Sequence, residues 1–382
     1  MILIRNLLII ILSALIPATL FETYLRIDGR YSDLVSTELY GSNTIWSRYP
    51  MSSQITKHPD TGLNVEVKFN EYGARGEAIS AMELDDTAIG FFGDSFTENR
   101  RIENRFSFNS YLSELSIDNA LLNFGVDGYG VAQSFQRWLN VKDSVDLDMV
   151  VYIFCSNDLR NTYEAQVFDR QLFAEGEIKN IVPIKVPYLI TLANSFHITY
   201  MAMEAYFKAK ALYKRGSELQ ASLFSTKLGD RFAHSMDNHK SRFHDKYADV
   251  MLEEYLSNDS SKETLESVKH LQLVIKKWQE MVEMDGGTFV IAVLPGKSDV
   301  AIAKKLFVNE KIIQLKSTLD IKQLKSFPWH FTTDDHWNEY GNLAAAISFR
   351  EFLTNQHGIH FYPVTNEWVE DKKSEILDYY RD

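Results

Sequence analysis

Four short apolar runs, each stopping at small or polar residues, set the pattern of this chain. They cover residues 87–92, 121–126, 149–154 and 288–294. Runs of this length that are apolar at consecutive positions predict strands buried on both faces. Segments with helical periodicity separate the runs. The pattern therefore predicts parallel strands joined by crossover helices, an α/β fold with a doubly wound sheet and helices on both faces.

The predicted helices follow from apolar residues spaced three and four apart. They cover residues 106–115, 132–139, about 265–282 and 343–353. The third helix is preceded by Ser260-Ser-Lys-Glu263, which we interpret as a capping box. Between residues 30 and 85 the periodicity is weak, and the patch at 65–69 predicts one or two edge strands in a lead-in segment.

The amino terminus is apolar from residue 7 to residue 21 and is closed by Glu22 and Arg26. With residues 1–4 it approaches the roughly 20 residues that a membrane-spanning helix needs. No small-x-small cleavage site follows, so we favour an uncleaved signal anchor over a cleaved signal peptide. Either interpretation places the remainder outside the cytoplasm, on the periplasmic side of a bacterial inner membrane or secreted.

These patterns divide the chain into five parts. They are a signal anchor or signal peptide at 1–26, a lead-in segment at 27–86, an α/β domain formed by 87–158 and 286–356, a mainly helical insertion at 159–285, and a carboxyl-terminal tail at 357–382. Within the insertion, the aromatic segment 188–215 fits a lid, a membrane-surface helix or a packing subdomain, and packing is the default.

Composition and charge exclude several classes of function. The formal net charge of −12 argues against nucleic-acid binding, because phosphate contacts need a basic surface. The single cysteine, Cys155, excludes an intrachain disulfide, and its apolar context predicts a buried core residue. His234, His239 and His244 recur every five residues, which does not place them on one helix face. We therefore expect no metal site and no cofactor.

Candidate chemistry gathers where the predicted strands end. Ser95 follows the first strand, Gly128 lies in a glycine-containing turn after the second, and Asn157 follows the third. A loop near the carboxyl terminus carries Asp334 and His336 just before a helix. Because parallel strands present their carboxyl ends at one sheet edge, we expect these residues to meet there.

This set of residues suits acyl transfer. A serine hydroxyl needs a general base, and His336 is the histidine beside carboxylates in such a loop. That base needs an orienting carboxylate, which Asp334 or, as the alternative, Asp335 would provide. The backbone N–H groups of Ser95 and Gly128 and the side-chain amide of Asn157 could form the oxyanion hole.

The chain resembles the SGNH/GDSL hydrolases. Gly93-Asp94-Ser95, Asn123-Phe-Gly-Val-Asp-Gly128, Asn157-Asp158 and the aspartate–histidine loop resemble the four blocks of that family in order. The resemblance covers most of residues 90–355. It implies a flavodoxin-like three-layer sandwich, with Ser95, Gly128, Asn157 and His336 as the defining residues.

Two positions depart from the family pattern. Cys155 stands where the third block usually has glycine, and Thr333 stands where the last block usually has the aspartate of Asp-x-x-His. The Asp334-Asp-His336-Trp337 arrangement is instead similar to sugar O-acetyltransferases of the alginate-modifying type. This resemblance implies an acetyl-transferring relative rather than a lipase.

We therefore expect a serine-dependent esterase or O-acyltransferase that acts on an acylated small molecule or an extracytoplasmic glycan. The N-terminal helix would contact the membrane, and a membrane-bound acyl donor would fit as a partner. The alternatives are a non-catalytic glycan-binding or assembly protein with the same fold, and a lipid-directed esterase that uses the insertion as a lid.

Overall fold

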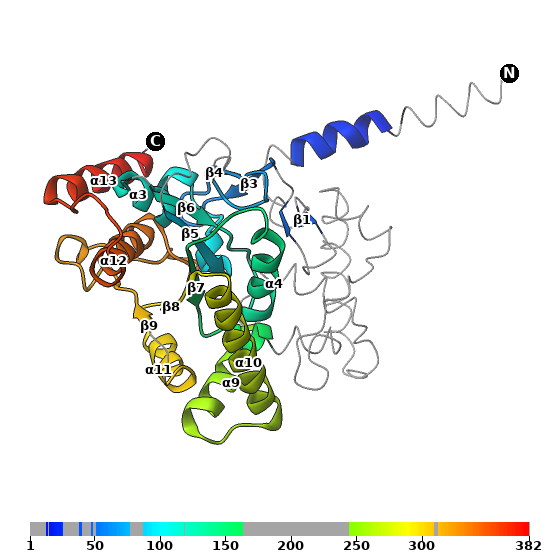
Figure 1. Cartoon of the computed structure of the whole chain (residues 1–382). Helices are drawn as coiled ribbons and strands as arrows, with labels where there is room; N and C mark the ends of the chain where they lie inside the picture. The colour runs from blue at the N-terminus through cyan, green and yellow to red at the C-terminus, as the bar shows by residue number, and fades with distance from the viewer. Residues whose placement is uncertain are drawn as a thin grey trace, which may run out of the picture.

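A computed structural model of the chain describes most of the predicted α/β domain (Figure 1). It describes residues 13, 15–25, 38–39, 47–48, 51–76, 87–117, 119–162, 244–308 and 312–381. The predictions for residues 188–215 and for His234 and His239 lie outside the described residues. Of the insertion, 159–162 and 244–285 are described, and the latter range holds two helices.

A five-stranded parallel sheet forms the centre of the structure. Its strands are β5 (Thr87–Gly93), β6 (Asn119–Asn123), β7 (Met149–Phe154), β8 (Thr288–Val293) and β9 (Ile312–Gln314). Their order across the sheet is β6-β5-β7-β8-β9. The chain moves outward from β5 to β6 and then returns to pair β7 on the other side of β5. This reversal is the topological switch point of a doubly wound sheet, where ligands bind outside the strands' carboxyl ends.

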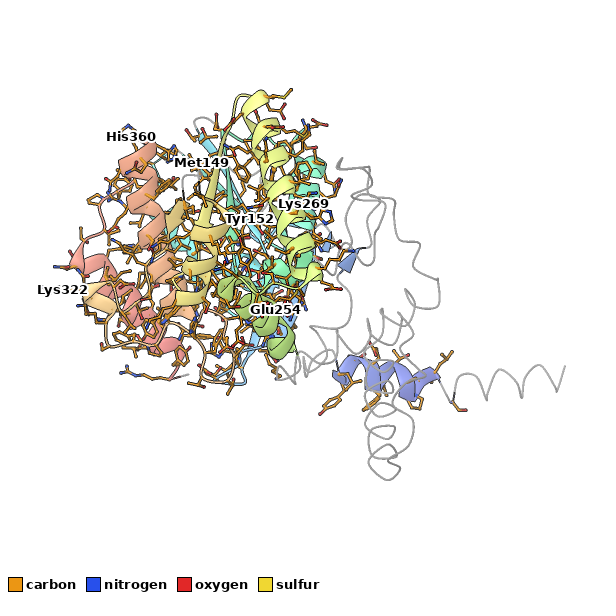
Figure 2. All side chains as sticks on the ribbon, turned by 90° about the horizontal axis from the view of Figure 1, so that it is seen from below. Met149, Tyr152, Glu254, Lys269, Lys322 and His360 are labelled. Carbon is orange, nitrogen blue, oxygen red and sulfur yellow. The ribbon has the colours of Figure 1, made fainter. Side chains whose placement is uncertain are left out.

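Helices cover both faces of this sheet and complete three layers (Figures 1 and 2). One face packs against α3 (Phe108–Leu115), α12 (Glu339–His357) and α13 (Asn366–Tyr379). The other face packs against α4 (Val131–Val141), α9 (His244–Ser257), α10 (Lys262–Met284) and α11 (Lys297–Leu306). In Figure 2, Met149 and Tyr152 lie in the sheet, with Lys269 of α10 on one side and His360 on the other. The predicted α/β class and parallel sheet are confirmed.

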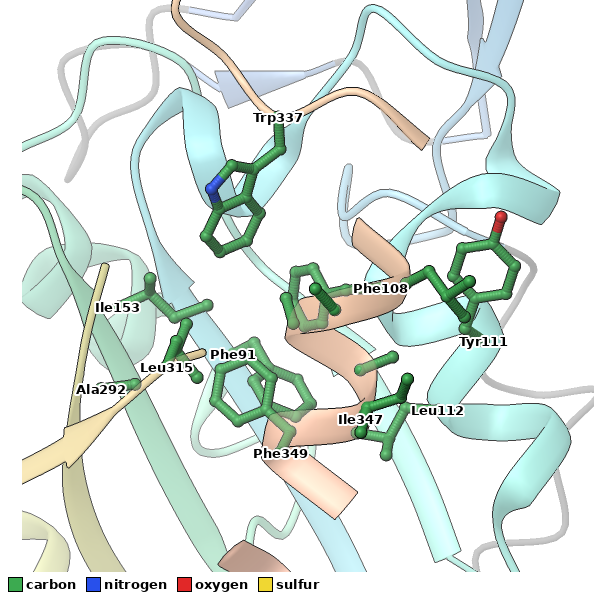
Figure 3. Close-up of a cluster of buried hydrophobic side chains, with 14 of the residues drawn as sticks. Phe91, Phe108, Tyr111, Leu112, Ile153, Ala292, Leu315, Trp337, Ile347 and Phe349 are labelled. Carbon is green, nitrogen blue, oxygen red and sulfur yellow. The ribbon is translucent and has the colours of Figure 1, made fainter. Parts of the chain in front are cut away.

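The central strands feed two separate hydrophobic cores because successive side chains point to opposite faces. Phe91 and Ile153 join the core under α3 and α12, which Figure 3 shows with Phe108 and Phe349 around Phe91. Phe92 joins the core under α4 and α10. Burial on both faces explains why these strands read as continuous apolar runs rather than as alternating ones.

The lead-in segment differs from the prediction of edge strands. Its residues form an antiparallel hairpin of β3 (Ser53–Lys57) and β4 (Asn64–Lys68), outside the five-stranded sheet. Alternating burial along both strands puts Val65 and Val67 into a small core of their own. The hairpin reaches the main sheet through an isolated bridge between Arg75 and Asn123. Upstream lie the two-residue strands β1 (Glu38–Leu39) and β2 (Ser47–Arg48), which pair with each other.

Several element boundaries also differ from the prediction. Strand β6 ends at Asn123 rather than near 126, because the Asn123 Oδ1 accepts the Gly125 N–H, at 3.0 Å, and turns the chain. Ser261, not Ser260, caps α10 by accepting the Thr264 N–H. The short strand β9, helix α11 and helix α13 in the tail were not predicted. Short helical turns occur at α2 (Ser95–Glu98), η2 (Asn104–Phe106) and η5 (Lys322–Leu324).

Residues 15–25 are helical and lie apart from the five-stranded sheet in Figure 1. Leu15, Ile16 and Leu20 are exposed there. Across the described residues, no helix has the length and apolar character that crossing a bilayer requires. The predicted signal anchor at 1–26 is therefore not confirmed.

Replacing Trp278 of α10 with alanine should destabilise the protein strongly. Trp278 is fully buried, and its ring centroid lies 5.5 Å from that of Phe92 and 5.6 Å from that of Tyr152. A cavity of this kind costs about 3–5 kcal/mol of unfolding free energy, measurable by urea denaturation. Leu265→Ala on the same helix is the control, because Leu265 is 55% exposed and should change stability by about 0.5 kcal/mol or less. Equal losses in the two variants would contradict this packing.

Candidate active site

Ser95 is presented at the end of β5 by a sharp turn. Gly93 has φ of +156°, and a Cβ at this position would lie 2.2 Å from the Thr97 Oγ1, so only glycine fits. Asp94 then caps α2, its Oδ1 accepting the Phe96 N–H at 2.9 Å. Ser95 is thus the first residue of the helical turn and not its cap, and its side chain is half-buried.

His336 reaches this serine from a loop 241 residues further along the chain. Its Nε2 lies 2.6 Å from the Ser95 Oγ. The imidazole packs on Phe96 with ring centroids 4.9 Å apart. The next residue, Trp337, is buried and points into the core shared by Phe91 and Phe108 (Figure 3). Burial of this indole fixes the loop on which His336 sits.

Asp334 is the carboxylate that contacts His336. Its Oδ1 accepts the His336 backbone N–H at 2.9 Å and is also hydrogen-bonded to the ring Nδ1. Burial alone would raise the pKa of Asp334, but the hydrogen bond and charge of His336 and the charge of Arg101 hold that pKa below its usual range. An ionised carboxylate only accepts hydrogen bonds, so Nδ1 carries the proton and Nε2 is left to accept the Ser95 hydroxyl proton.

The neighbouring loop residues have different positions. Asp335 is exposed, whereas Thr333 donates its hydroxyl to the Pro59 carbonyl at 3.4 Å. The residue at the family's usual aspartate position therefore joins this loop to the hairpin. The Asp-x-His spacing works because Asp334 folds back on the backbone of His336 as an Asx turn.

The expected oxyanion donors lie at the ends of adjacent strands. Ser95 is the first residue of α2, so its N–H belongs to the first turn, where N–H groups have no partner within the helix. Gly128 has φ of +78°, in the left-handed region that glycine adopts freely, and is exposed in its turn. The Asn157 Nδ2 donates to the Asp94 Oδ2 at 3.0 Å, which ties this amide to the residue before Ser95. One of the two amide hydrogens is thereby used.

The residue after Asn157 is a buried carboxylic acid. Asp158 is fully buried, and its Oδ2 accepts the Tyr152 hydroxyl at 2.8 Å and the Cys155 N–H at 2.9 Å. Burial and the charge of Asp94 raise the pKa of Asp158 well above its usual value. Cys155 is buried as predicted, and burial raises the pKa of its thiol, which makes it a poor nucleophile.

Other residues of the loop that carries His336, here named the histidine loop (residues 329–338), have mainly structural contacts. Asn338 caps α12 by accepting the Gly341 N–H at 3.0 Å, while its Nδ2 donates to the carbonyls of Pro328 and His330. Trp329 and His330 are half-buried, with ring centroids 3.6 Å apart. Over the described ranges, no group of three His, Cys, Asp or Glu side chains is arranged to hold a metal ion.

The structure adds residues that the sequence reasoning missed. Arg101 forms an ion pair with Asp334, and Asp60 of the hairpin accepts two hydrogen bonds from Thr332 in the histidine loop. The adjacent arginines Arg100 and Arg101, a few residues after Ser95 in an acidic chain, were the one available signal. Nothing in the sequence of the hairpin indicated a contact more than 270 residues away.

Comparison with known proteins adds a likeness of fold only. No protein-family profile matches the chain, and neither does any curated protein. Among solved structures, a member of the lipolytic protein G-D-S-L family from Veillonella parvula DSM 2008 is similar at 12% identity with a TM-score of 0.36. The match covers 71% of this chain and 100% of the other.

A second similar structure is an alpha/beta hydrolase enzyme from the metagenome of Lake Arreo, Spain. It is 9% identical, with a TM-score of 0.31, and the match covers 69% of this chain and 94% of that one. At this level the likeness carries no argument about function, which rests on the geometry of the site.

The buried Asp94 predicts a specific pH dependence of stability. Burial raises its pKa from 3.8 to about 6, against hydrogen bonds from the Phe96 N–H and Asn157 and the charge of His336. Because the pKa of Asp94 is higher in the folded than in the unfolded state, its protonated form stabilises the fold. That contribution is fully present below about pH 4 and is lost as pH rises through about 6. The loss is on the order of 3 kcal/mol. Asp94→Asn should therefore gain stability relative to the unmodified protein between pH 4 and 7, measured by urea unfolding.

The matched control is Asp259→Asn, because Asp259 is exposed on the surface. Its stability difference from the unmodified protein should stay constant over the same pH range. A constant difference for Asp94→Asn as well would show that Asp94 is not held protonated by burial.

Proposed function

We propose that this protein is a serine-dependent esterase or O-acyltransferase with Ser95 as its nucleophile. One observation carries the proposal. A continuous hydrogen-bonded chain runs from the Asp334 Oδ1 through the His336 Nδ1 and Nε2 to the Ser95 Oγ. This arrangement has the geometry of a nucleophile, a base and an orienting acid, which defines such triads independently of chain order.

The reaction follows from these contacts. The Ser95 Oγ attacks the acyl carbonyl carbon while the His336 Nε2 takes the hydroxyl proton, and Asp334 stabilises the imidazolium that forms. The carbonyl oxygen becomes an oxyanion that the N–H groups of Ser95 and Gly128 and the Asn157 amide can bind. Collapse expels the alcohol, which takes the proton from His336. Water or a second hydroxyl then attacks the acyl-Ser95 ester by the reverse steps.

The finer assignment is to acetyl transfer on an extracytoplasmic glycan. The Asp-x-His-Trp sequence at 334–337 supports it, as does the apolar N-terminal segment that would anchor the protein in the membrane. A membrane-bound acyl donor is the corresponding partner. The binding-protein alternative was motivated by Cys155 and by the missing Asp-x-x-His motif. Neither departure prevents the triad contacts, because Asp334 takes the acid's place and Cys155 is buried below Asn157.

Covalent labelling tests the nucleophile directly. A fluorophosphonate probe should label purified protein at Ser95, identified by peptide mass spectrometry, because only an activated hydroxyl reacts readily. Ser95→Ala and His336→Ala should both lose the label. Ser113→Ala, a helix serine that donates to the Asn109 carbonyl, is the control and should label normally. A folded protein that does not label would support the binding-protein alternative.

The oxyanion hole makes a quantitative prediction. Asn157→Ala should lower kcat for hydrolysis of an acetyl ester about 10²- to 10³-fold, the usual loss for one oxyanion donor. The KM should change little, because the contact strengthens in the transition state. Asn161→Ala is the control, since Asn161 donates to the Tyr129 carbonyl at 3.3 Å. An unchanged kcat in Asn157→Ala would remove this residue from the oxyanion hole.

A further inference from the structure

The Asp334 carboxylate is divided between two partners. Its Oδ1 serves His336, accepting the backbone N–H and contacting the ring Nδ1. Its Oδ2 is paired with the Arg101 Nη1. The two paired side chains are 14% and 18% exposed, so water only partly screens the pair. Such charge-assisted hydrogen bonds are stronger and more directional than neutral ones.

This division matters because of where Asp334 lies in the chain. It precedes His336 by only two residues, in a loop without regular secondary structure. A carboxylate that bonded only to His336 could rotate and exchange its oxygens. Arg101 removes that freedom by fixing Oδ2, which leaves Oδ1 facing the imidazole.

Arg101 is itself held by a buried frame. The Arg75 guanidinium donates to the carbonyls of Glu98 and Ile102, both at 2.8 Å, and to that of Asn99. Arg75 is 2% exposed, and its backbone N–H donates to the Asn123 carbonyl at 3.0 Å. The loop that carries Arg101 is therefore tied to the edge of the main sheet.

The segment that precedes Arg75 contacts the histidine loop through His58 and Asp60. The Asp60 Oδ1 accepts the Thr332 N–H at 2.8 Å and its hydroxyl at 2.5 Å. The His58 Nδ1 accepts the N–H groups of Asp60 and Thr61, so its proton is on Nε2, which donates to Glu339 at 2.9 Å. Glu339 is the first residue of α12, directly after the loop.

A direct tie joins the two loops. The Asn99 Nδ2 donates to the Trp337 carbonyl at 3.1 Å, and Asn99 adopts the left-handed conformation with φ of +43°. The loop that carries Arg101 and the loop that carries Asp334 are thus fixed to each other and, through residues 58–75, to a common support.

We propose that Arg101 is a positioning residue for acyl transfer, fixing the Asp334 carboxylate so that its Oδ1 orients His336 toward Ser95. The proposal rests on the proposed function for its kinetic test. Arg101 pairs with the oxygen of Asp334 that does not serve the imidazole, so it acts through Asp334 and not on the substrate. Its loss should therefore lower kcat and leave KM nearly unchanged.

Arg101→Gln tests this. The kcat for an acetyl ester should fall about 10- to 100-fold. Losses of this size follow in metal sites when a hydrogen-bonding group that orients a histidine is removed. The acid limb of the pH profile of kcat/KM should move to higher pH, because a cation near the base is lost. The titratable and charged groups near His336 are Asp334, Asp94 and His330, with Asp335 in the same loop and Arg101 paired with Asp334. Arg101→Lys keeps the positive charge but loses the planar guanidinium with its fixed donors. It should therefore restore the pH profile more fully than it restores kcat.

The matched control is Arg105→Gln. Arg105 lies on the same stretch and also pairs with a carboxylate, that of Glu103, but it is 60% exposed, and its guanidinium packs over the rings of Phe106 and Tyr379. Its kcat and pH profile should equal those of the unmodified protein. If Arg101→Gln raised KM at constant kcat, Arg101 would be a substrate contact and the proposal would be wrong. Equal behaviour of the two variants would also overturn it.

A spectroscopic measurement separates this proposal from the proposed function. The hydrogen-bonded proton on the His336 Nδ1 should give a downfield proton resonance that His336→Ala lacks. Arg101→Gln should weaken or shift that resonance even if no ester is turned over. An inactive, unlabelled protein with this resonance and its Arg101 dependence would refute the proposed function alone. An active protein whose resonance ignores Arg101→Gln would refute the positioning role alone.

Discussion

The position of β5 between β6 and β7 is the constraint on which the rest of the site depends. Because the chain leaves β5 in one direction and returns on the other side, the loops after β5 and β7 separate there and leave room for a ligand. Ser95 and Asn157 are the residues that follow these two strands. The hydrogen bond between Asp94 and Asn157 joins the two strand ends across this point.

The local pattern of the chain was enough to predict the layers and the polar residues at the strand ends. Buried strands such as β7 are apolar at every position, and α10 carries one apolar stripe, so both signals are strong. Strand β9 is too short to give a pattern, and α13 is mostly polar, with buried side chains at Val369, Ile376 and Tyr379. Such elements are stabilised by tertiary packing, which local sequence does not encode.

The same distinction applies to the site. Ser95, His336 and Asp334 were predictable because their chemistry is recognisable in a short motif. Arg101 and Asp60 were not, because an arginine or an aspartate in a loop is ordinary until its partner is known. The preference for Asp334 over Asp335 as the partner of His336 depends on which side chain turns back on the backbone, and that is a matter of three-dimensional geometry. The burial of the Asp94 and Asp158 carboxylates shows a similar dependence, because tertiary packing rather than local sequence removes them from water.

The contact between His58 and Glu339 has a consequence for how the protein matures. These residues are 281 positions apart, so the hairpin can engage its partner only after nearly the whole chain is present. Closing so long a loop is slow, whereas the β5-to-β7 core consists of near neighbours in sequence. The pairings of β5 with β6 and β7 can thus form before the hairpin supports the histidine loop. The contact between the His336 and Ser95 side chains, which joins segments 241 residues apart, is therefore among the last to form.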